Sequence, residues 1–376
     1  MLITADKVFD GQQFLTDVTV EIAAGEIVAI HNRKMPEARC YKGILTAGFI
    51  DYHVNGGGGL LFNFAPEAET LKTMLLAHAK FGTTALLPTL ITDDLDTMSK
   101  AADAVAQVLS LETPGILGIH FEGPHLSVPK KGVHIESFIR PISDAEHSLF
   151  SRADLGIKLI TLAPENVSDQ DLETLINNDV KVSIGHTNAD FDRAVSAVSS
   201  GADGFTHLFN AMSPFTSREP GVLGAALALD NTWCGIILDG HHMHYSSAKI
   251  AYKAKPKGKL LIVTDAMSTI GSSQENFDFF GIEVIKDGDK LATKQGTLAG
   301  SALDMVTAVK NAVNEVGIEL AEALNMASLY PAEYLGISEN SGSIQVGKQA
   351  DLIVINDQFQ VTNTWIAGDL VHSLQD

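Results

Sequence analysis

The chain has 376 residues, 45% of them hydrophobic, which is enough for one large domain with a substantial core and a smaller second domain. Its formal net charge of −20 favours solubility and argues against a nucleic-acid-binding surface, which would normally be basic. No apolar stretch is long enough to span a bilayer, so we expect no membrane partner and, from the charge, no nucleic-acid partner. Two cysteines, Cys40 and Cys234, do not make a disulfide framework, so we expect a cytoplasmic protein.

Both ends of the chain predict β-structure. Between residues 18 and 30, hydrophobic residues alternate with polar ones on either side of a turn at Gly25, as in a hairpin with one exposed face. Near the other end, three segments have the character of strands: 343–346, 351–355 and 361–366. Because these ends flank a different kind of sequence, we predict a small β-sandwich domain formed by residues 1–46 together with 341–376.

The middle of the chain, residues 47–340, alternates predicted strands and helices. The expected strands are the stretch before His53, then 83–87, 115–122, 157–162, 180–186, 204–207 and 259–265. The expected helices are 69–80, 94–109, 169–177, 190–199, 301–316 and 320–328. This length suits a (β/α)8 TIM-like barrel, which typically needs roughly 250 residues. A doubly wound open sheet is the alternative. It is less favoured because residues able to do chemistry follow at least five strands, and a closed barrel brings that many strand ends to one site.

Four of the apolar runs end on side chains that bind metals or transfer protons. These side chains are Glu122, His186, His207 and Asp265. Because the carboxyl ends of parallel barrel strands meet on one face, we expect the four to form one site. A carboxylate and two imidazoles suit a divalent metal, and a further carboxylate suits proton transfer. Any one of them alone could instead be a hydrogen-bonded core residue or a helix cap. Together they predict a metal-dependent hydrolase.

The first barrel strand carries His53, and Asn55 stands two residues later. A His-x-His pair would place two ligands on one face of a strand, because strand side chains repeat every two residues. Asparagine is a poor transition-metal ligand, so the pattern argues against a complete second metal site. The glycines at 56–59 lack the spacing of a phosphate-binding loop and predict a close-packed turn.

Ten motifs along the chain, taken together, are specific. They are AGFID at 47–51, LPTLIT at 87–92, HFEGP at 120–124, KKGVH at 130–134, GHTNA at 185–189, THLFNAM at 206–212, REPG at 218–221, DGHH at 239–242, VTDA at 263–266 and GTLAGS at 296–301. In these motifs, and nearly from end to end, the chain resembles the N-acetylglucosamine-6-phosphate deacetylase family of the amidohydrolase superfamily.

The resemblance implies roles for individual positions. The family's metal ligands correspond to Glu122, His186 and His207, and its catalytic acid/base corresponds to Asp265. His134 matches the residue that contacts the substrate amide and polarises its carbonyl. The substrate-binding positions correspond to Asn210, Ala211, Leu298 and His242, the last near the phosphate. Arg218 matches an arginine that reaches the phosphate in the neighbouring subunit, which implies a homodimer. The resemblance also implies one divalent metal ion per subunit, zinc first and iron, cobalt or manganese as alternatives, with His53 as the neighbour of any second ion.

The implied activity is hydrolysis of the acetamide of N-acetylglucosamine 6-phosphate to glucosamine 6-phosphate and acetate, in amino-sugar catabolism. One alternative is a cyclic amidohydrolase of the dihydroorotase or hydantoinase type, which usually needs His-x-His and a carboxylated lysine. A second alternative is a non-catalytic amidohydrolase-like scaffold, although loss of catalysis should erase the ligands that this chain retains.

Overall fold

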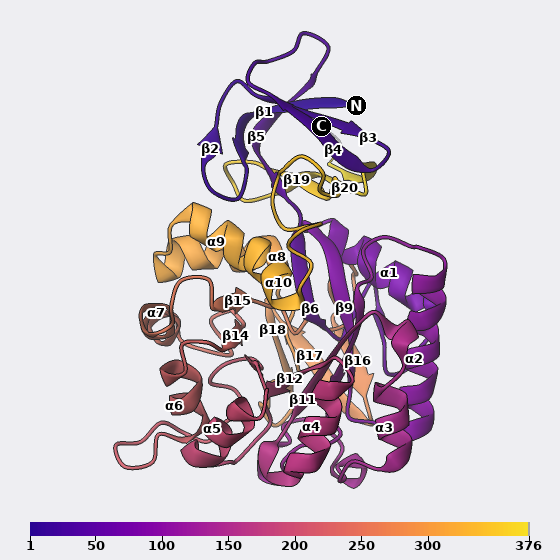
Figure 1. Ribbon diagram of the computed structural model, residues 1–376, viewed down its shortest axis with the longest axis vertical. Helices are drawn as coiled ribbons and strands as arrows, with labels where there is room; N and C mark the ends of the chain where they lie inside the picture. Colours follow the sequence, from indigo (N-terminus) through magenta and orange to yellow (C-terminus); the bar gives the residue numbers. More distant parts are fainter. Residues whose placement is uncertain (375–376) are drawn as a thin grey trace.

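Eight parallel strands form the centre of the molecule in the computed structural model, which describes residues 1–374 (Figure 1). Their order is β15-β14-β13-β12-β11-β10-β9-β6. Their bounds are β6 (Phe49–Val54), β9 (Thr83–Ile91), β10 (Gly118–Glu122), β11 (Ile157–Leu162), β12 (Val180–Ile184), β13 (Gly204–Phe205), β14 (Trp233–Ile236) and β15 (Leu260–Ile262). A parallel bridge between Val54 and Ala266 joins the two outer strands, so the sheet closes into the predicted barrel rather than an open sheet.

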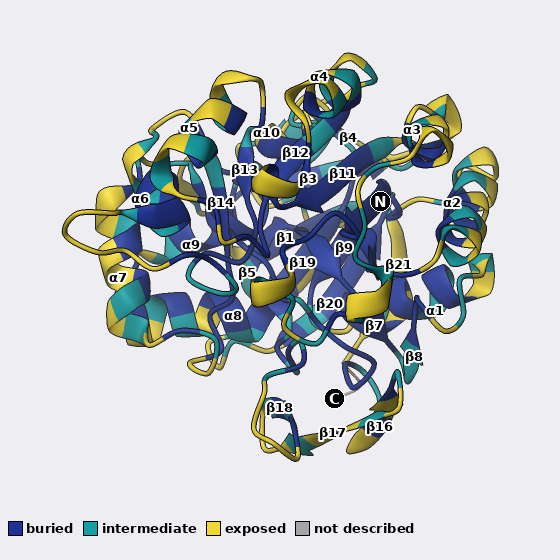
Figure 2. Cartoon of the chain, turned by 90° about the horizontal axis from the view of Figure 1, so that it is seen from below, coloured by how far each residue is buried: buried dark blue, intermediate teal, exposed yellow. Residues whose placement is uncertain are grey.

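Helices cover the outside of this barrel, with buried faces inward and exposed faces outward (Figure 2). They are α1 (Ala68–Ala79), α2 (Leu95–Ser110), α3 (Asp144–Phe150), α4 (Asp169–Asn177), α5 (Phe191–Ser199), α6 (Gly221–Ala228), α7 (Tyr245–Ala254), α8 (Met305–Asn311), α9 (Leu320–Ala327) and α10 (Leu329–Leu335). The short helices are η1 (Val128–Lys130), η2 (Glu136–Phe138), η3 (Ala153–Leu155), η4 (Pro164–Asn166) and the π-helix η5 (Ala312–Val316). The helix predicted from residue 301 begins only at Met305, because Asp304 caps it by accepting the Thr307 N–H at 2.8 Å. Within residues 1–374, none of the helices has the length and apolar character needed to cross a membrane.

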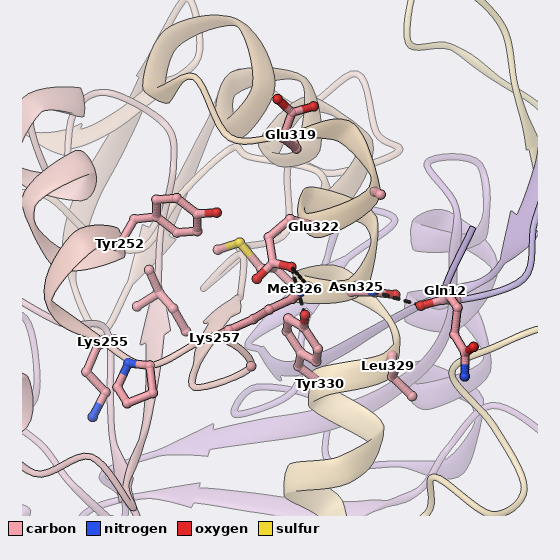
Figure 3. Close-up of a pocket in the computed structure, with 15 residues that line it drawn as sticks. Gln12, Tyr252, Lys255, Lys257, Glu319, Glu322, Asn325, Met326, Leu329 and Tyr330 are labelled. Atoms are coloured by element: carbon pink, nitrogen blue, oxygen red, sulfur yellow. Dashed lines mark hydrogen bonds and ion pairs between the residues drawn. The ribbon is translucent and has the colours of Figure 1, made fainter. Parts of the chain in front are cut away.

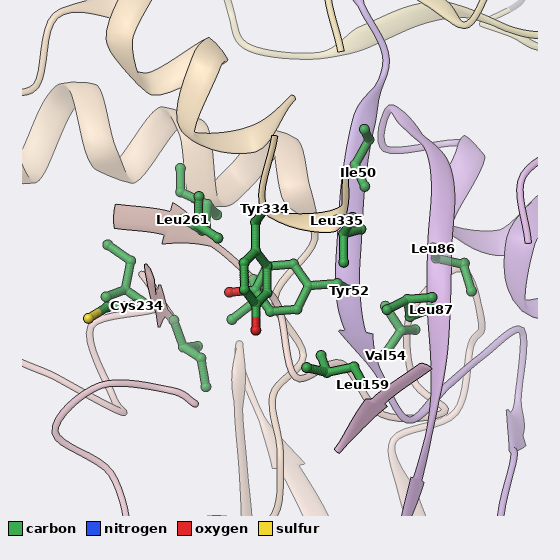
Figure 4. Packing of buried hydrophobic residues seen from close by; sticks show 14 of the residues in the cluster. Ile50, Tyr52, Val54, Leu86, Leu87, Leu159, Cys234, Leu261, Tyr334 and Leu335 are labelled. Carbon is green, nitrogen blue, oxygen red and sulfur yellow. The ribbon is translucent and has the colours of Figure 1, made fainter. Parts of the chain in front are cut away.

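Two tyrosines fill part of the barrel interior among aliphatic side chains (Figure 4). The rings of Tyr52 on β6 and Tyr334 on α10 lie 5.4 Å apart, tilted by 61°. Glycines on two strands make room for their hydroxyl groups. A Cβ atom at Gly235 would lie 2.7 Å from the Tyr52 hydroxyl, and one at Gly204 would come still closer to the Tyr334 hydroxyl, so both would clash. Glycine at positions 204 and 235 is therefore required for the two tyrosines to pack inside the barrel.

Strands from both ends of the chain form a separate β domain above the barrel (Figure 1). They are β1 (Leu2–Phe9), β2 (Phe14–Leu15), β3 (Thr19–Ala23), β4 (Glu26–His31), β5 (Arg39–Ala47), β19 (Leu352–Ile355), β20 (Val361–Ile366) and β21 (Asp369–Ser373). The antiparallel pairing of β5 with β19 joins the two ends, around a core that includes Trp365. The strand predicted at 343–346 is wrong: this segment is a loop in which Ile344 is buried. The proposed domain boundaries, 1–46 with 341–376, stay a prediction.

A three-stranded antiparallel sheet projects from the rim of the barrel, and no pattern in the sequence predicted it (Figure 2). This outer sheet consists of β16 (Asn276–Phe279), β17 (Ile282–Asp287) and β18 (Lys290–Thr293). Its Phe279 belongs to a cluster of buried residues that also includes Ile91 and Met267 of the barrel. Of the glycines at 56–59, where a turn was predicted, Gly56 and Gly57 form the short strand β7 (Gly56–Gly57). Gly58 and Gly59 form the turn to β8 (Leu60–Leu61), and their amides donate to backbone carbonyls.

Candidate active site

The predicted functional side chains lie at the carboxyl ends of five barrel strands. His53 is near the end of β6 and Glu122 is the last residue of β10. His186, His207 and Asp265 follow β12, β13 and β15 by two or three residues. Each of these three has a positive backbone φ, 46°, 32° and 54° respectively, so the chain turns sharply where each strand ends. The strands thereby bring residues from distant parts of the sequence to one place, as predicted.

Glu122, His186 and His207 form a buried cluster of ligand atoms. Glu122 Oε1 lies 3.2 Å from His186 Nε2 and 3.1 Å from His207 Nε2, and the two Nε2 atoms lie 3.0 Å apart. His186 Nδ1 contacts the carbonyl oxygen of Lys130 at 2.8 Å. Because a carbonyl only accepts, Nδ1 carries the hydrogen and Nε2 of the neutral ring presents a lone pair to the cluster. Converging lone pairs and a carboxylate oxygen are a donor set that fits a divalent metal.

The ionisation of this cluster also suits a metal. Burial disfavours a charge on Glu122, but the charge of His53 and the close contacts with His186 and His207 hold the pKa of Glu122 well below its usual value. Burial lowers the pKa of His207, despite its contact with the Glu122 carboxylate. The cluster therefore combines an anionic carboxylate with neutral imidazole, the protonation states in which these groups bind metals.

His53 lies on the other side of Glu122, beside Asp265. Its Nε2 atom is 3.2 Å from Glu122 Oε2 and 3.3 Å from Asp265 Oδ1, and these three residues are a second group whose geometry could hold an ion. Burial alone would lower the pKa of His53, but the carboxylates of Glu122 and Asp265 raise it to about 9. A protonated imidazole therefore offsets one of the two negative charges of these carboxylates.

Asp265 is the most accessible carboxylate of the site. Its side chain is 13% exposed, against 3% for Glu122. The side-chain amide of Asn55 donates to Asp265 Oδ1 at 2.5 Å. Among residues 1–374, no group donates a hydrogen bond to its second oxygen, Oδ2. One oxygen of Asp265 is therefore anchored and the other is available to a reacting molecule.

A cavity of about 260 Å³ opens onto these groups. All the predicted substrate-binding residues except Arg218 line it, namely His134, Asn210, Ala211, His242 and Leu298. The outer sheet contributes Phe279, and the segment that follows this sheet contributes Thr297. The cavity also includes Asn55, Ile91 and Met267, none of which was predicted to contact a substrate.

His134 lies between the cavity and the ligand cluster. Its Nδ1 atom is 2.8 Å from the hydroxyl oxygen of Thr92, and its Nε2 atom is 3.8 Å from Glu122 Oε2. Burial, reinforced by the neighbouring His186, lowers the pKa of His134 to about 3, so the ring is neutral. Thr92 was not predicted as a partner, because it belongs to a different strand–loop segment of the chain.

His242 is held by Asp239. Nδ1 of His242 lies 2.6 Å from Asp239 Oδ2, and the backbone N–H groups of His241 and His242 donate to Asp239 Oδ1 at 2.8 Å. Burial lowers the pKa of His242, but the Asp239 carboxylate more than offsets this, so the pKa is raised. His244, two residues after His242, caps α7 by accepting the Ser246 N–H.

Arg218 lies outside the cavity on an exposed loop. The same loop exposes Phe215, whose side chain is 61% exposed. The structure therefore does not bring Arg218 to the site of its own chain. His120, which precedes the ligand Glu122 by two residues, is buried between the hydroxyls of Thr89 and Thr161 and does not line the cavity.

A larger cavity, of about 660 Å³, lies at the opposite end of the barrel, near the start of β15 (Figure 3). Its polar groups largely pair with one another: Glu322 accepts from the Tyr330 hydroxyl at 2.8 Å and lies 3.5 Å from Lys257 Nζ. Nζ of Lys255 donates hydrogen bonds to the backbone carbonyls of Ala226 and Leu229. We therefore place the active site in the smaller cavity, which contains the converging ligands and the accessible carboxylate.

Comparisons with known proteins identify relatives of the chain. The model of the family described as "Amidohydrolase family" matches residues 44–371. An N-acetylgalactosamine-6-phosphate deacetylase of Shewanella sp. (strain ANA-3) is 50% identical over 90% of this chain and 86% of its own length. An N-acetylglucosamine-6-phosphate deacetylase of Haemophilus influenzae is 39% identical over 92% and 93%. The crystal structure of N-acetylglucosamine-6-phosphate deacetylase from Pasteurella multocida superposes with a TM-score of 0.94 at 38% identity, covering 98% of this chain and 99% of that one.

Proposed function

The chain belongs to the amidohydrolase family, and from this premise we propose that it hydrolyses the acetamide of an N-acetylhexosamine 6-phosphate. The products are acetate and the amino-sugar phosphate, and the first substrate we propose is N-acetylglucosamine 6-phosphate, in amino-sugar catabolism. One observation carries the proposal: Glu122, His186 and His207 converge next to Asp265 in a single cavity. Relatives and structural neighbours named as deacetylases of such sugars support it.

The galactose epimer is a second candidate substrate. The relative with 50% identity is named an N-acetylgalactosamine-6-phosphate deacetylase. The two sugars differ only in the configuration at C4, and both carry the same acetamide and phosphate. Measuring kcat/KM for acetate release from each sugar phosphate decides between them, because a preference of tenfold corresponds to about 1.4 kcal/mol of transition-state discrimination.

We propose one divalent metal ion per subunit, bound by Glu122, His186 and His207. When bound, such an ion supplies Lewis acidity, which lowers the pKa of a water molecule from about 15.7 to about 7 and polarises a carbonyl group. Zinc is the first choice, with iron, cobalt or manganese as alternatives, since imidazole and carboxylate ligands suit all four. The role of Glu122 is to add negative charge to a ligand set whose other two members are imidazoles.

Asp265 is the residue to which we assign proton transfer. It takes a proton from the attacking water as the new C–O bond forms at the acyl carbon. It then returns this proton to the amide nitrogen as the C–N bond breaks, so that acetate and a free amine leave. The anchoring of Oδ1 by Asn55 leaves Oδ2 for both transfers.

His134 is assigned to the carbonyl oxygen of the substrate. Nδ1 of His134 contacts the Thr92 hydroxyl at 2.8 Å, and we assign the tautomer in which this hydroxyl donates to Nδ1 and the ring hydrogen is on Nε2, on the side of Glu122. This Nε2–H can donate to the oxygen that becomes negative in the transition state. One such donor is typically worth about 3–4 kcal/mol.

The rest of the substrate is assigned to the remaining cavity residues. We propose that His242 binds near the phosphate, supported by the carboxylate of Asp239, and that Asn210, Ala211 and Leu298 bind the sugar. Since Arg218 lies outside its own cavity, we propose that it reaches the phosphate in a second copy of the chain, so that the active form is a homodimer.

The free thiols support a reducing compartment, and we propose that the enzyme works in the cytoplasm. Cys40 is exposed and Cys234 is buried, and neither is paired.

Two alternatives make different use of the same scaffold. A cyclic amidohydrolase of the dihydroorotase or hydantoinase type usually needs a carboxylated lysine, whereas no lysine of the described chain lines the cavity. A non-catalytic scaffold would not need to keep four reactive groups together.

The test is acetate release from N-acetylglucosamine 6-phosphate by metal-stripped protein, before and after adding a divalent cation. We expect turnover only after the addition. Turnover of dihydroorotate or a hydantoin in place of the sugar phosphate would contradict the proposal, and so would no turnover of any of them.

A further inference from the structure

Asn55 makes two hydrogen bonds with the segment that carries Asp265, and its neighbour His53 makes a third. The backbone N–H of Asn55 donates to the carbonyl of Ala266 at 2.9 Å, and the N–H of Asp265 donates back to the carbonyl of His53 at 2.9 Å. The side-chain amide of Asn55 donates to Asp265 Oδ1 at 2.5 Å. These contacts span 210 residues of sequence and lie where the first and last barrel strands meet. Asn55 is only 4% exposed and borders the cavity.

Only one of the two orientations of the Asn55 side-chain amide allows a hydrogen bond to Asp265. In the observed state Nδ2 faces the carboxylate, and Oδ1 is buried without a partner among residues 1–374. Turning the amide over would place its oxygen against Asp265 Oδ1, and two acceptors at this distance repel. The amide therefore acts only as a donor toward Asp265, although leaving its own oxygen unpaired costs stability.

We propose that Asn55 is a positioning residue that selects which oxygen of Asp265 transfers the proton. This proposal rests on the proposed function. A carboxylate can rotate by half a turn and exchange its two oxygens. The amide of Asn55, together with His53 Nε2 at 3.3 Å, holds Oδ1 and keeps Oδ2 free. A neutral amide does this without adding charge and without a hydrogen that can be lost at neutral pH. Asparagine at this position is therefore an orienting group rather than a degenerate metal ligand.

The variant Asn55→Leu tests the proposal, because leucine has the same number and branching of side-chain heavy atoms and cannot donate. We expect kcat for acetate release to fall by about 10–100-fold, the usual effect of removing a group that orients a catalytic residue. KM should stay within about twofold, since Asn55 acts through Asp265, and the metal content should not change. Asn55→Asp keeps the shape but turns the donor into an acceptor, so its kcat should fall at least as far.

Asn325→Leu is the matched control. Asn325 is also a buried asparagine, 7% exposed, that donates one hydrogen bond through Nδ2, to the carbonyl of Gly11 at 3.0 Å, and leaves Oδ1 unpaired. It lies at the opposite end of the barrel, in the larger cavity (Figure 3). Both leucine variants should lose thermal stability, but only Asn55→Leu should lose kcat.

Two outcomes would overturn the positioning role. The first is an Asn55→Leu enzyme with kcat equal to that of Asn325→Leu, and the second is a loss expressed in KM or in metal content. The proposed function fails separately, since it fails only if the unmodified enzyme releases no acetate from either sugar phosphate.

Discussion

Replacing Asp265 with asparagine is the most direct perturbation of the proposed chemistry. The change keeps the size of the side chain and removes its ability to take a proton. General acid–base catalysis typically contributes about 10²–10⁴-fold, which at about 1.36 kcal/mol per tenfold is about 2.7–5.4 kcal/mol of barrier. The structure favours the upper end of this range. The other nearby carboxylate, Glu122, lies within 3.2 Å of three imidazoles and has no free oxygen to replace Asp265.

The assay is acetate release, with metal content measured on the same samples. Because Glu122, His186 and His207 are untouched, Asp265→Asn should keep the metal content of the unmodified enzyme while kcat falls by about 10⁴-fold. Asp230→Asn serves as the control, since Asp230 is exposed and outside the cavity. Near-normal turnover of Asp265→Asn would refute the assignment of proton transfer. Loss of metal in step with turnover would instead show that Asp265 is a ligand.

Three further predictions address the metal, the phosphate and the subunit contact. Glu122→Gln should weaken metal binding by at least about 100-fold, measured as metal retained after dialysis against a chelator. Asp239 raises the pKa of His242, so its imidazolium should persist at pH values above 6.5, the ordinary pKa of histidine. KM should rise as the pH passes through the raised pKa, because the positive charge proposed to bind the phosphate is then lost. In Asp239→Asn this rise in KM should begin at a lower pH, with kcat little changed, and an unshifted KM profile would refute the pairing. Arg218→Ala should raise KM. A mixed dimer of one Arg218→Ala subunit and one Asp265→Asn subunit should contain one complete active site only if Arg218 acts across the interface.

The strand-end residues could be predicted because their signal is local. Each apolar run that ends on Glu122, His186, His207 or Asp265 is visible within a few neighbouring residues, and the barrel geometry then requires the ends to meet. The observed cluster distances of 3.0–3.2 Å are the physical consequence of that geometry. The strand 157–162 and the helix 169–177 were predicted with the observed bounds for the same reason, since their hydrophobic periods are regular.

Partners that depend on distant segments could not be predicted in this way. Nothing near Asn55 indicates that its amide meets a carboxylate 210 residues later, and nothing near His134 indicates Thr92. The outer sheet was missed because Phe277 and Phe279 alternate with polar residues over only four positions, too few to separate a strand from a loop. Ile344 was assigned to a strand because it is apolar, whereas it is buried by packing against the β domain without pairing in a sheet.

The backbone at the strand ends connects the fold to the chemistry. His186, His207 and Asp265 have left-handed φ values, a conformation that costs about 1–2 kcal/mol for a residue other than glycine. Glycine would relieve this strain but could neither bind a metal nor move a proton. The surrounding hydrogen bonds hold the strained turns in place, notably the pair in which Asp265 N–H donates to His53 and Asn55 N–H donates to Ala266. The same two bonds help to close the barrel between β6 and the segment after β15, so closure of the sheet and orientation of the Asp265 carboxylate depend on the same contacts.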